Sequence, residues 1–309
     1  MDMTNIEKLE ASLWDPISEI QPAWVLEPEA LGSKEKFWYR PGPEGRNWLF
    51  KFPQVNTGQH WAEKVAAGIA DLLQIQHARV EFAVFQGTQG SASESFITRD
   101  KRADLVHGNE VLAGQVVGYD PRRRFRQADH TFSNILTAIG GAFLGGAPPK
   151  ILATLGGYLV LDAVIGNTDR HHENWAFLAW SSQDKRMAVM APSFDHASSL
   201  GRELLDEGPK KCRKRLLAET RVGRYSEHAH GAIFWQSTDK HGLSPLELVR
   251  RGVRERPEMF LGAIQKACAL RREQIAAIVE RVPADWMSPL ARDFAIALAE
   301  YNVQQLRNI

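Results

Sequence analysis

The chain has 309 residues, of which 44% are hydrophobic, so it can form one large domain or two lobes with a substantial core. Its formal net charge of +1 gives no support to a general binding surface for nucleic acid or for an anionic membrane. The N-terminal residues lack a basic start followed by an apolar run, and no apolar run reaches membrane-spanning length, so we expect a soluble, cytoplasmic protein. The two cysteines, Cys212 and Cys268, lie far apart and suit reduced thiols better than a disulfide framework.

The first hundred residues are predicted to form strands and one long helix. Two runs, KFWYR at 36–40 and NWLFKF at 47–52, flank the turn sequence PGPEG and predict a β-hairpin. Residues 57–75 place apolar side chains at helical spacing, with Thr57 as the expected N-terminal cap. RVEFAVFQG and SESFITRD, at 79–87 and 93–100, are further strand candidates.

The rest of the chain is predicted to be mainly helical. The runs 131–145 and 151–165 are predicted to be two mostly buried helices, separated by the breaker GGAPPK. NWAFLAW and RMAVMAP then predict a short β-hairpin around SSQDK, and helical patterns continue from Gly201. A Gly-containing stretch at 106–124 is the predicted boundary, which gives an N-terminal extension at 1–30, a β-rich part at 31–118 and a helical part at 119–309.

A polar break interrupts the apolar segment before residue 180. Residues 166–174 read GNTDRHHEN and are followed at once by apolar residues, although buried segments rarely admit polar groups that lack a partner or a role. Asp169 and Asn174 precede one predicted strand, and Asp195 follows the next in PSFDHASSLG. Phosphoryl transfer needs this inventory, because one carboxylate orients the attacking hydroxyl while an Asn and another Asp hold the metal ions.

These two stretches resemble the catalytic and metal-binding motifs of HipA-like kinases, whose pattern is close to N-x-D-x-H-x-x-N followed by a D-containing loop. The resemblance implies an α+β, two-lobed protein-kinase-like fold with an ATP cleft between a β-rich N-lobe and a helical C-lobe. It also implies that Asp169 is the catalytic base, that His171 supports the catalytic loop, and that Asn174 and Asp195 are the magnesium ligands. Asp162 is expected to brace this loop. Phosphatidylinositol kinases carry a related D-R-H-x-x-N signature.

The N-terminal half contains segments similar to the remaining nucleotide-binding parts of this family. LGSKEKFWY resembles the family's phosphate loop, which implies that the nucleotide phosphates are covered by Gly32, Ser33, Lys34, Glu35 and Lys36. Ser33 is also the hydroxyl that we hypothesise is autophosphorylated, if such regulation exists. On the next predicted strand, Lys51 stands where a kinase keeps its phosphate-binding lysine, and Glu63 could be its ion-pair partner. LVHGNEVL, which contains Asn109, falls where an adenine-contacting linker is expected.

The resemblance implies an ATP- and Mg²⁺-dependent Ser/Thr protein kinase that acts as the toxin of a toxin–antitoxin system. Its expected partners are a protein substrate, such as an aminoacyl-tRNA synthetase or another translation component, and a small helix-turn-helix antitoxin. We expect neither membrane association nor direct nucleic-acid binding. A lipid or small-molecule kinase and a nucleotide-binding pseudokinase with a regulatory role are the alternative functions.

Structural explanations for the same residues remain open at this point. Asp169, Asn174 and Asp195 could each belong to ordinary turns, Lys51 could extend to solvent from an edge strand, and Glu63 could be an exposed helix charge. His171, His172 and Glu173 suggest zinc, but they lack the i, i+4 histidine pair of helical zinc proteases. The basic run at 210–215 could contact an acidic or nucleic-acid-bearing target, or it could be a solvated helix face.

Overall fold

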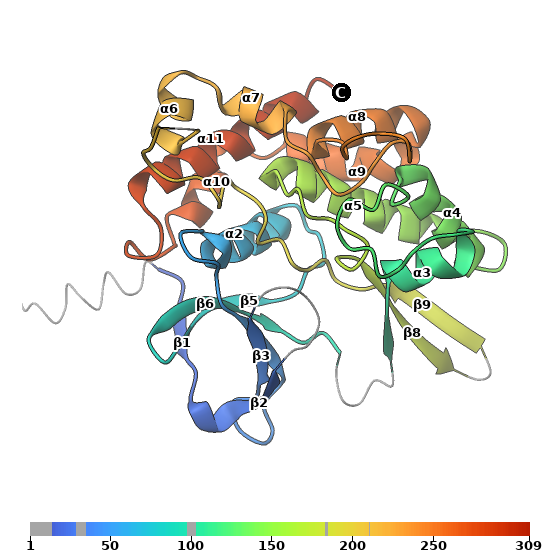
Figure 1. Ribbon diagram of the computed structural model, residues 1–309, viewed down its shortest axis with the longest axis horizontal. Coiled ribbons are helices and arrows are strands. Elements are labelled where there is room, and N and C mark those ends of the chain that lie inside the picture. The colour runs from blue at the N-terminus through green and yellow to red at the C-terminus, as the bar shows by residue number, and fades with distance from the viewer. Residues whose placement is uncertain (1–13, 29–34, 98–102, 183–184, 210) are drawn as a thin grey trace, which may run out of the picture.

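The computed structural model describes residues 14–28, 35–97, 103–182, 185–209 and 211–309. It has a mixed α+β architecture, in which a six-stranded sheet lies below a layer of helices and a three-stranded sheet lies to one side (Figure 1). Within these residues, no helix combines the length and apolar character needed to cross a membrane.

The six-stranded sheet is built almost entirely from antiparallel neighbours in the order β1-β5-β6-β4-β3-β2. The strands are β1 (Ile17–Glu19), β2 (Val25–Pro28), β3 (Lys36–Tyr39), β4 (Trp48–Lys51), β5 (Val80–Phe85) and β6 (Thr88–Glu94). The predicted hairpin is confirmed as β3 and β4, whose register places Lys36 directly opposite Lys51. Strands β1 and β2, which come from the segment predicted as an extension, pair with the two ends of this sheet.

Strand β6 begins earlier than its predicted position. Residues 93–100 were expected to form the strand, but β6 occupies Thr88–Glu94, Ser95 to Ile97 lie outside it, and 98–100 are outside the described residues. Gly90 permits this pairing, because a Cβ atom there would lie 2.4 Å from the Phe50 ring on the neighbouring strand. Glycine is common in turns, but at position 90 it is required because the neighbouring strand packs closely against it inside the sheet.

Helix α2 (Gln59–Leu72) crosses the sheet and joins it to the helical layer. Its apolar residues, including Trp61 and Ile69, belong to the main hydrophobic core. Thr57 was wrongly predicted as its cap: the N-cap position is Gly58, and the Thr57 hydroxyl donates instead to the Gln54 carbonyl at 2.8 Å. The helix therefore begins one residue later, with no side-chain cap.

A second sheet of three strands begins at the predicted boundary region. The predicted hairpin around SSQDK is confirmed as β8 (Ala176–Ser182) and β9 (Lys185–Met190), which pair antiparallel. A third strand, β7 (Asp104–His107), was not predicted and pairs with β8. It leads directly into α3 (Gly108–Gln115), so the predicted linker is a strand followed by a helix.

Helix α5 (Pro149–Ile165) is buried on nearly all sides, as expected for a central helix. The remaining helices are the short η1 (Pro22–Trp24) and α4 (Phe132–Ala142), α6 (Arg213–Ala218), α7 (Val222–Glu227), α8 (Pro245–Glu255), α9 (Pro257–Cys268), α10 (Arg272–Val279) and α11 (Pro289–Leu306). Thr131 caps α4 by accepting from the Asn134 backbone N–H at 3.0 Å. Helices α8, α9 and α11 cover α5, so the chain that leaves this helix starts from a rigid position.

Candidate active site

The polar break begins where α5 ends. Gly166 has φ +65 and ψ +37, a left-handed conformation that ends the helix and turns the chain toward the sheet. Asp162, in the last turn of α5, accepts two hydrogen bonds from Arg170, each at 2.7 Å, and a third from Asn167 Nδ2 at 2.8 Å. The polar groups of this buried loop are therefore one another's partners, which confirms the expectation that Asp162 braces the loop.

Arg170 connects this loop to the segment after β9. Its guanidinium also donates to the Asn174 carbonyl at 2.7 Å and to the Ser193 hydroxyl at 3.1 Å. The side chains of Arg170 and Asp162 are 3% and 4% exposed, so the ion pair is screened from water. Burial alone would lower the pKa of Arg170, but the neighbouring Asp162 charge more than offsets this and raises the pKa.

Asp169 lies at the centre of the loop that Arg170 holds. Its backbone N–H donates to Asn167 Oδ1 at 3.2 Å, and its backbone carbonyl accepts from Asn174 Nδ2 at 2.7 Å. One carboxylate oxygen, Oδ2, accepts a hydrogen bond from the Ser198 hydroxyl at 3.3 Å. These contacts hold Asp169 and Asn174 in a fixed relation on one turn of chain.

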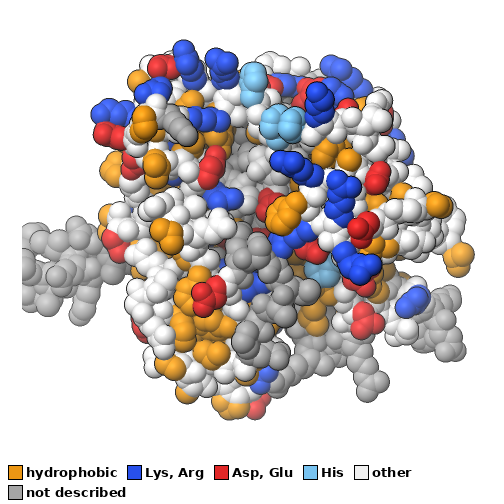
Figure 2. Space-filling view, in the orientation of Figure 1, with side chains coloured by type: hydrophobic (Ala, Val, Ile, Leu, Met, Phe, Trp, Pro, Cys, Tyr) orange, Lys and Arg blue, Asp and Glu red, His pale blue; other side chains and the backbone are white. Residues whose placement is uncertain are grey.

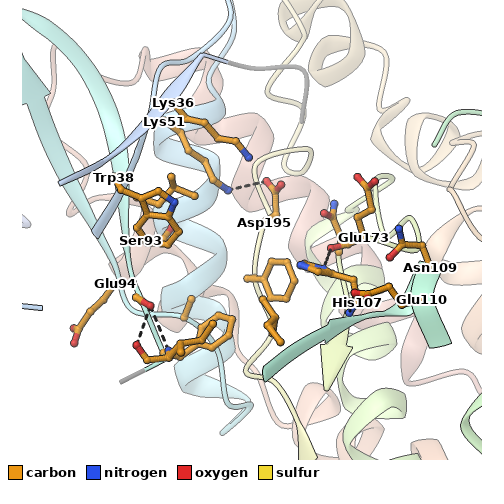
Figure 3. Close-up of a pocket in the computed structure, with 18 of the residues that line it drawn as sticks. Lys36, Trp38, Lys51, Ser93, Glu94, His107, Asn109, Glu110, Glu173 and Asp195 are labelled. Carbon is orange, nitrogen blue, oxygen red and sulfur yellow. Dashed lines mark hydrogen bonds and ion pairs between the residues drawn. The ribbon is translucent and has the colours of Figure 1, made fainter. Parts of the chain in front are cut away.

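Lys51 and Asp195 meet across the gap between the six-stranded sheet and the segment after β9. The Lys51 ammonium is 3.1 Å from Asp195 Oδ1 (Figure 3). It is also 3.9 Å from Glu63 Oε2. Glu63 is 1% exposed, and its Oε1 accepts from the His196 backbone N–H at 2.9 Å. Glu63 thus binds the segment that carries Asp195 and lies beside Lys51, which rules out the exposed-helix explanation.

Electrostatics keep this lysine charged. Burial by itself lowers the pKa of Lys51, but the carboxylates of Asp195 and Glu63 have the larger combined effect and raise it. Asp195 adopts φ +58, a left-handed conformation that is uncommon outside glycine but that Asp adopts more readily than most residues. This local backbone conformation accompanies the 3.1 Å contact between the Asp195 carboxylate and the lysine.

A cavity of about 360 Å³ surrounds the lysine. Lys36, Trp38 and Lys51 line it from β3 and β4, and Figure 3 shows His107, Asn109, Glu110 and Glu173 on the opposite side, with Asp195 between the two sets. Its apolar lining, which the motifs did not identify, consists of Trp38, Leu49, Ala78, Phe96, Ile97, Leu105 and Phe194. A deep cleft with apolar walls and convergent charges is typical of a site for a flat, charged ligand.

The predicted site residues other than Glu63, which is buried beside Lys51, divide into four groups. Lys36, Lys51, Asn109, Asn174 and Asp195 line the cavity; Asp169 and His171 line a second cleft beside it. The Glu35 side chain is exposed and lines neither space, although its carbonyl accepts from the Phe52 backbone N–H at 3.2 Å. The predictions for Gly32, Ser33 and Lys34 lie outside the described residues.

His171 is a neutral, buried side chain. Burial, followed by the nearby Arg124 charge, lowers its pKa to about 3. Arg124 Nε lies 3.3 Å from His171 Nε2 and 3.4 Å from a carboxylate oxygen of Glu173. An uncharged ring in this position can orient the loop, but it does not take up a second proton to become imidazolium at neutral pH.

Several residues at the site were given no role in the sequence analysis. Ser198 and Arg202 form a hydrogen-bonded chain to the Asp169 carboxylate. Arg202 donates to the Ser198 hydroxyl at 3.2 Å, and this hydroxyl donates to Asp169 Oδ2. His107 contacts the Glu173 carbonyl at 3.0 Å and so joins β7 to the catalytic-loop candidate. Ser198 and His107 each had a sequence signal, because they lie in the quoted segments PSFDHASSLG and LVHGNEVL, whereas Arg202 had none.

The oxygen atoms at Asn174 and Asp195 fit a magnesium ion. The Asn174 amide nitrogen is used by the Asp169 carbonyl, which leaves Oδ1 as an acceptor, and the Asp195 carboxylate lines the cavity. Mg²⁺ usually takes one or two protein oxygens together with water and substrate phosphates. No cluster of three or more His, Cys, Asp and Glu side chains suited to a metal occurs among the described residues, and this disfavours the zinc alternative.

Comparison with protein families agrees with this geometry. The HipA-like C-terminal domain family matches residues 29–286, which include strands β3 to β6 of the six-stranded sheet, the cavity lining and both loops. The chain belongs to the HipA-like C-terminal domain family. Comparison with curated proteins gives no sequence match.

Two solved structures share the fold of this HipA-like chain. One is the crystal structure of a Helicobacter pylori proinflammatory kinase, CtkA, at 16% identity with a TM-score of 0.75, covering 95% of this chain and 98% of that one. The other is the Shewanella oneidensis MR-1 toxin–antitoxin complex of HipA, HipB and operator DNA, at 14% identity with a TM-score of 0.53, covering 99% of this chain and 72% of that one. The mixed α+β architecture is therefore that of HipA-like structures.

Proposed function

We propose that this HipA-like protein is an ATP- and Mg²⁺-dependent Ser/Thr protein kinase. In this proposal the sheet and α2 form the N-lobe, the helical layer forms the C-lobe, and ATP occupies the 360 Å³ cavity. The observation that carries the proposal is the 3.1 Å contact between Lys51 and Asp195, in a cavity that Asn174 also lines. The kinase named among the similar structures supports it.

The charge pattern on the sheet supports an anionic ligand. Lys36 and Lys51 are directly opposite each other on β3 and β4, and both line the cavity. Like charges in this position destabilise a sheet. Phosphate groups between them would remove that repulsion, and the apolar walls formed by Trp38 and Leu105 would accommodate a base.

The chemistry follows from the positions of the polar groups. The acceptor hydroxyl oxygen attacks the γ-phosphorus, the bond from that phosphorus to the bridging oxygen breaks, and ADP leaves. Asp169 accepts the hydroxyl proton, while Lys51 stabilises charge on the phosphates. Asn174 and Asp195 would hold Mg²⁺, which supplies the charge that neutralises the transferring phosphoryl group. His171 and Ser198 keep Asp169 in place.

Transfer of label from γ-labelled ATP tests the proposal. Wild-type protein with Mg²⁺ is expected to label a protein acceptor, and Asp169→Ala is expected to abolish labelling while binding of ATP survives, because Asp169 does not line the nucleotide cavity. Asp104→Ala makes the same change at an exposed carboxylate on β7 outside both spaces, and should retain labelling.

The alternatives give different results in the same assay. Label that appears only on lipid or a small molecule would support the alternative kinase classes and overturn the protein-kinase assignment. Binding of ATP with no label on any acceptor would support a pseudokinase. Labelling that persists in Asp169→Ala would refute the role given to this carboxylate.

We further propose that the kinase is the toxin of a toxin–antitoxin pair. The similar Shewanella HipA was solved with HipB and operator DNA, which suggests a small helix-turn-helix protein as the partner of this chain. A translation component such as an aminoacyl-tRNA synthetase is the proposed target. We expect expression of the wild type to arrest growth and expression of Asp169→Ala not to do so. Co-expression of the protein encoded in the adjacent reading frame should relieve the arrest.

A further inference from the structure

A second cleft of about 180 Å³ opens beside Asp169, on the other side of the catalytic-loop candidate from the nucleotide cavity. Arg124 lines both spaces, so they are neighbours. Among the described residues that line this second cleft, Asp169 is the only carboxylate. The cleft is therefore placed to receive whatever group presents its hydroxyl to Asp169.

The walls of this cleft carry an excess of positive charge. Arg124, Arg126 and Lys240 line it, and only Arg124 has a salt bridge among the described residues, at 3.4 Å to Glu173. Arg126 and Lys240 are exposed. Two further arginines, Arg122 and Arg123, are exposed on the same loop, and the described residues give neither an ion-pair partner.

Ring side chains complete the rim of the cleft. Phe125, between the two lining arginines, is 70% exposed. His230 and His241 stack at 4.3 Å between ring centroids and form part of the opposite wall. On the face drawn in Figure 2, Lys and Arg side chains gather together with His side chains over the helical layer. An exposed aromatic ring set among cations is a common feature of a surface that binds a partner.

We propose that this cleft binds the acceptor protein through an acidic segment, with Asp or Glu residues on both sides of the Ser or Thr that is phosphorylated. This inference rests on the proposed kinase function and adds the substrate class. Among the described residues that line the cleft, Asp169 contributes the only negative charge, so an acidic segment would meet the lining cations, whereas a basic segment would be repelled. Nucleic acid is disfavoured because a single exposed ring offers no track of stacking platforms along a strand.

Peptide binding tests the inference without any need for turnover. Three fluorescent peptides of equal length carry one central Ser flanked by Glu, Ala or Lys residues, and a single-stranded oligonucleotide of matched charge is the fourth probe. Their affinities for the wild-type protein with ADP and Mg²⁺ are measured by anisotropy. The Glu peptide is expected to bind at least about tenfold more tightly than the Ala peptide, and this advantage should shrink between about 0.05 and about 0.5 M salt.

Charge reversal locates the binding site. The double variant R126E/K240E should lose the preference for the Glu peptide, and R122E/R123E provides a second reversal on the same loop. The matched control R254E/K266E makes the same change in net charge at exposed positions on α8 and α9, outside both spaces, and should bind as wild type does. Equal melting temperatures would show that all variants remain folded.

Three results would overturn the inference: equal affinity for the Glu and Lys peptides, equal loss in the control variant, or tighter binding of the oligonucleotide than of the Glu peptide. A wild type that binds the Glu peptide selectively but labels no acceptor would count against the kinase proposal while supporting the acidic docking cleft. A wild type that labels all three peptides alike would support the kinase proposal and count against the acidic docking cleft.

Discussion

Removing one charge of the buried Asp162–Arg170 pair should strongly destabilise the whole protein. In Asp162→Asn the side chain keeps its size, but Arg170 loses the carboxylate that accepts two of its hydrogen bonds at 2.7 Å. An amide offers one oxygen and turns an N–H₂ group toward either Arg170 or Asn167. The guanidinium, with its side chain only 3% exposed, would then be a buried charge without a counter-ion.

The size of this effect follows from the burial of the pair. Breaking a buried ion pair by removing one partner costs about 3–5 kcal/mol, and we expect the lower end because Asn retains one acceptor. For a domain of this size that corresponds to a fall in the melting temperature of about 5–15 °C. Arg170→Met should cost as much or more, since the Asn174 carbonyl and Ser193 hydroxyl lose a donor as well.

Denaturant unfolding followed by circular dichroism measures these costs. In the double variant Asp162→Asn/Arg170→Met the total should be smaller than the sum of the single effects by about 2 kcal/mol, because no buried charge remains. Glu207→Gln removes one partner of the exposed Lys214–Glu207 pair and should leave the midpoint unchanged. A cost below about 1 kcal/mol for Asp162→Asn would refute the reasoning, because it would mean that water reaches the pair.

Three further predictions concern the nucleotide site, the pH dependence of stability and the end of α5. Lys51→Met should lower kcat/KM for ATP by about 10²–10³-fold, whereas Lys150→Met, at an exposed position on α5, should not change it. Burial lowers the pKa of His130 to about 4, below the value of about 6.5 in the unfolded chain. The neutral His130 ring therefore contributes fully to stability above about pH 6.5, and this contribution is lost as the pH falls. From about pH 7 to about pH 5 the free energy of unfolding should fall by about 2 kcal/mol less in His130→Gln than in wild type. Gly166→Ala should lower the melting temperature, with a cost of about 1 kcal/mol at its left-handed φ, whereas Gly114→Ala in α3 should raise it slightly.

Each of these predictions has a contrary outcome. Wild-type kcat/KM in Lys51→Met would remove the lysine from the phosphate site. Parallel pH profiles for wild type and His130→Gln would mean that this histidine titrates normally in the folded protein. Equal effects of alanine at positions 166 and 114 would show that the left-handed turn after α5 is not needed.

Individual helices and strands, and the kinds of polar residue at the site, could be predicted from the sequence because both depend on residues that are close together in the chain. Alternation of apolar side chains around a Pro/Gly turn was enough for the β3–β4 hairpin, and the spacing of Asp169, Asn174 and Asp195 was enough for the family. The predicted start of β6 was wrong because Gly90 packs against Phe50 on a strand that is distant in the sequence, and the predicted cap of α2 was wrong because the Thr57 hydroxyl donates to the nearby Gln54 carbonyl.

Tertiary structure alone decided which of these residues meet. Lys51 and Asp195 are far apart in the chain, but the Lys51 ammonium lies 3.1 Å from an Asp195 carboxylate oxygen. Glu63 on α2 contacts both segments, because it lies beside Lys51 and accepts a hydrogen bond from the backbone N–H of His196. The cationic cleft is likewise assembled from loops around residues 124, 169 and 240 that share no motif. Side-chain types and their periodicity can be read from a short stretch of sequence. Distances between remote segments depend instead on how the helices pack around α5, and no short stretch of sequence contains that information.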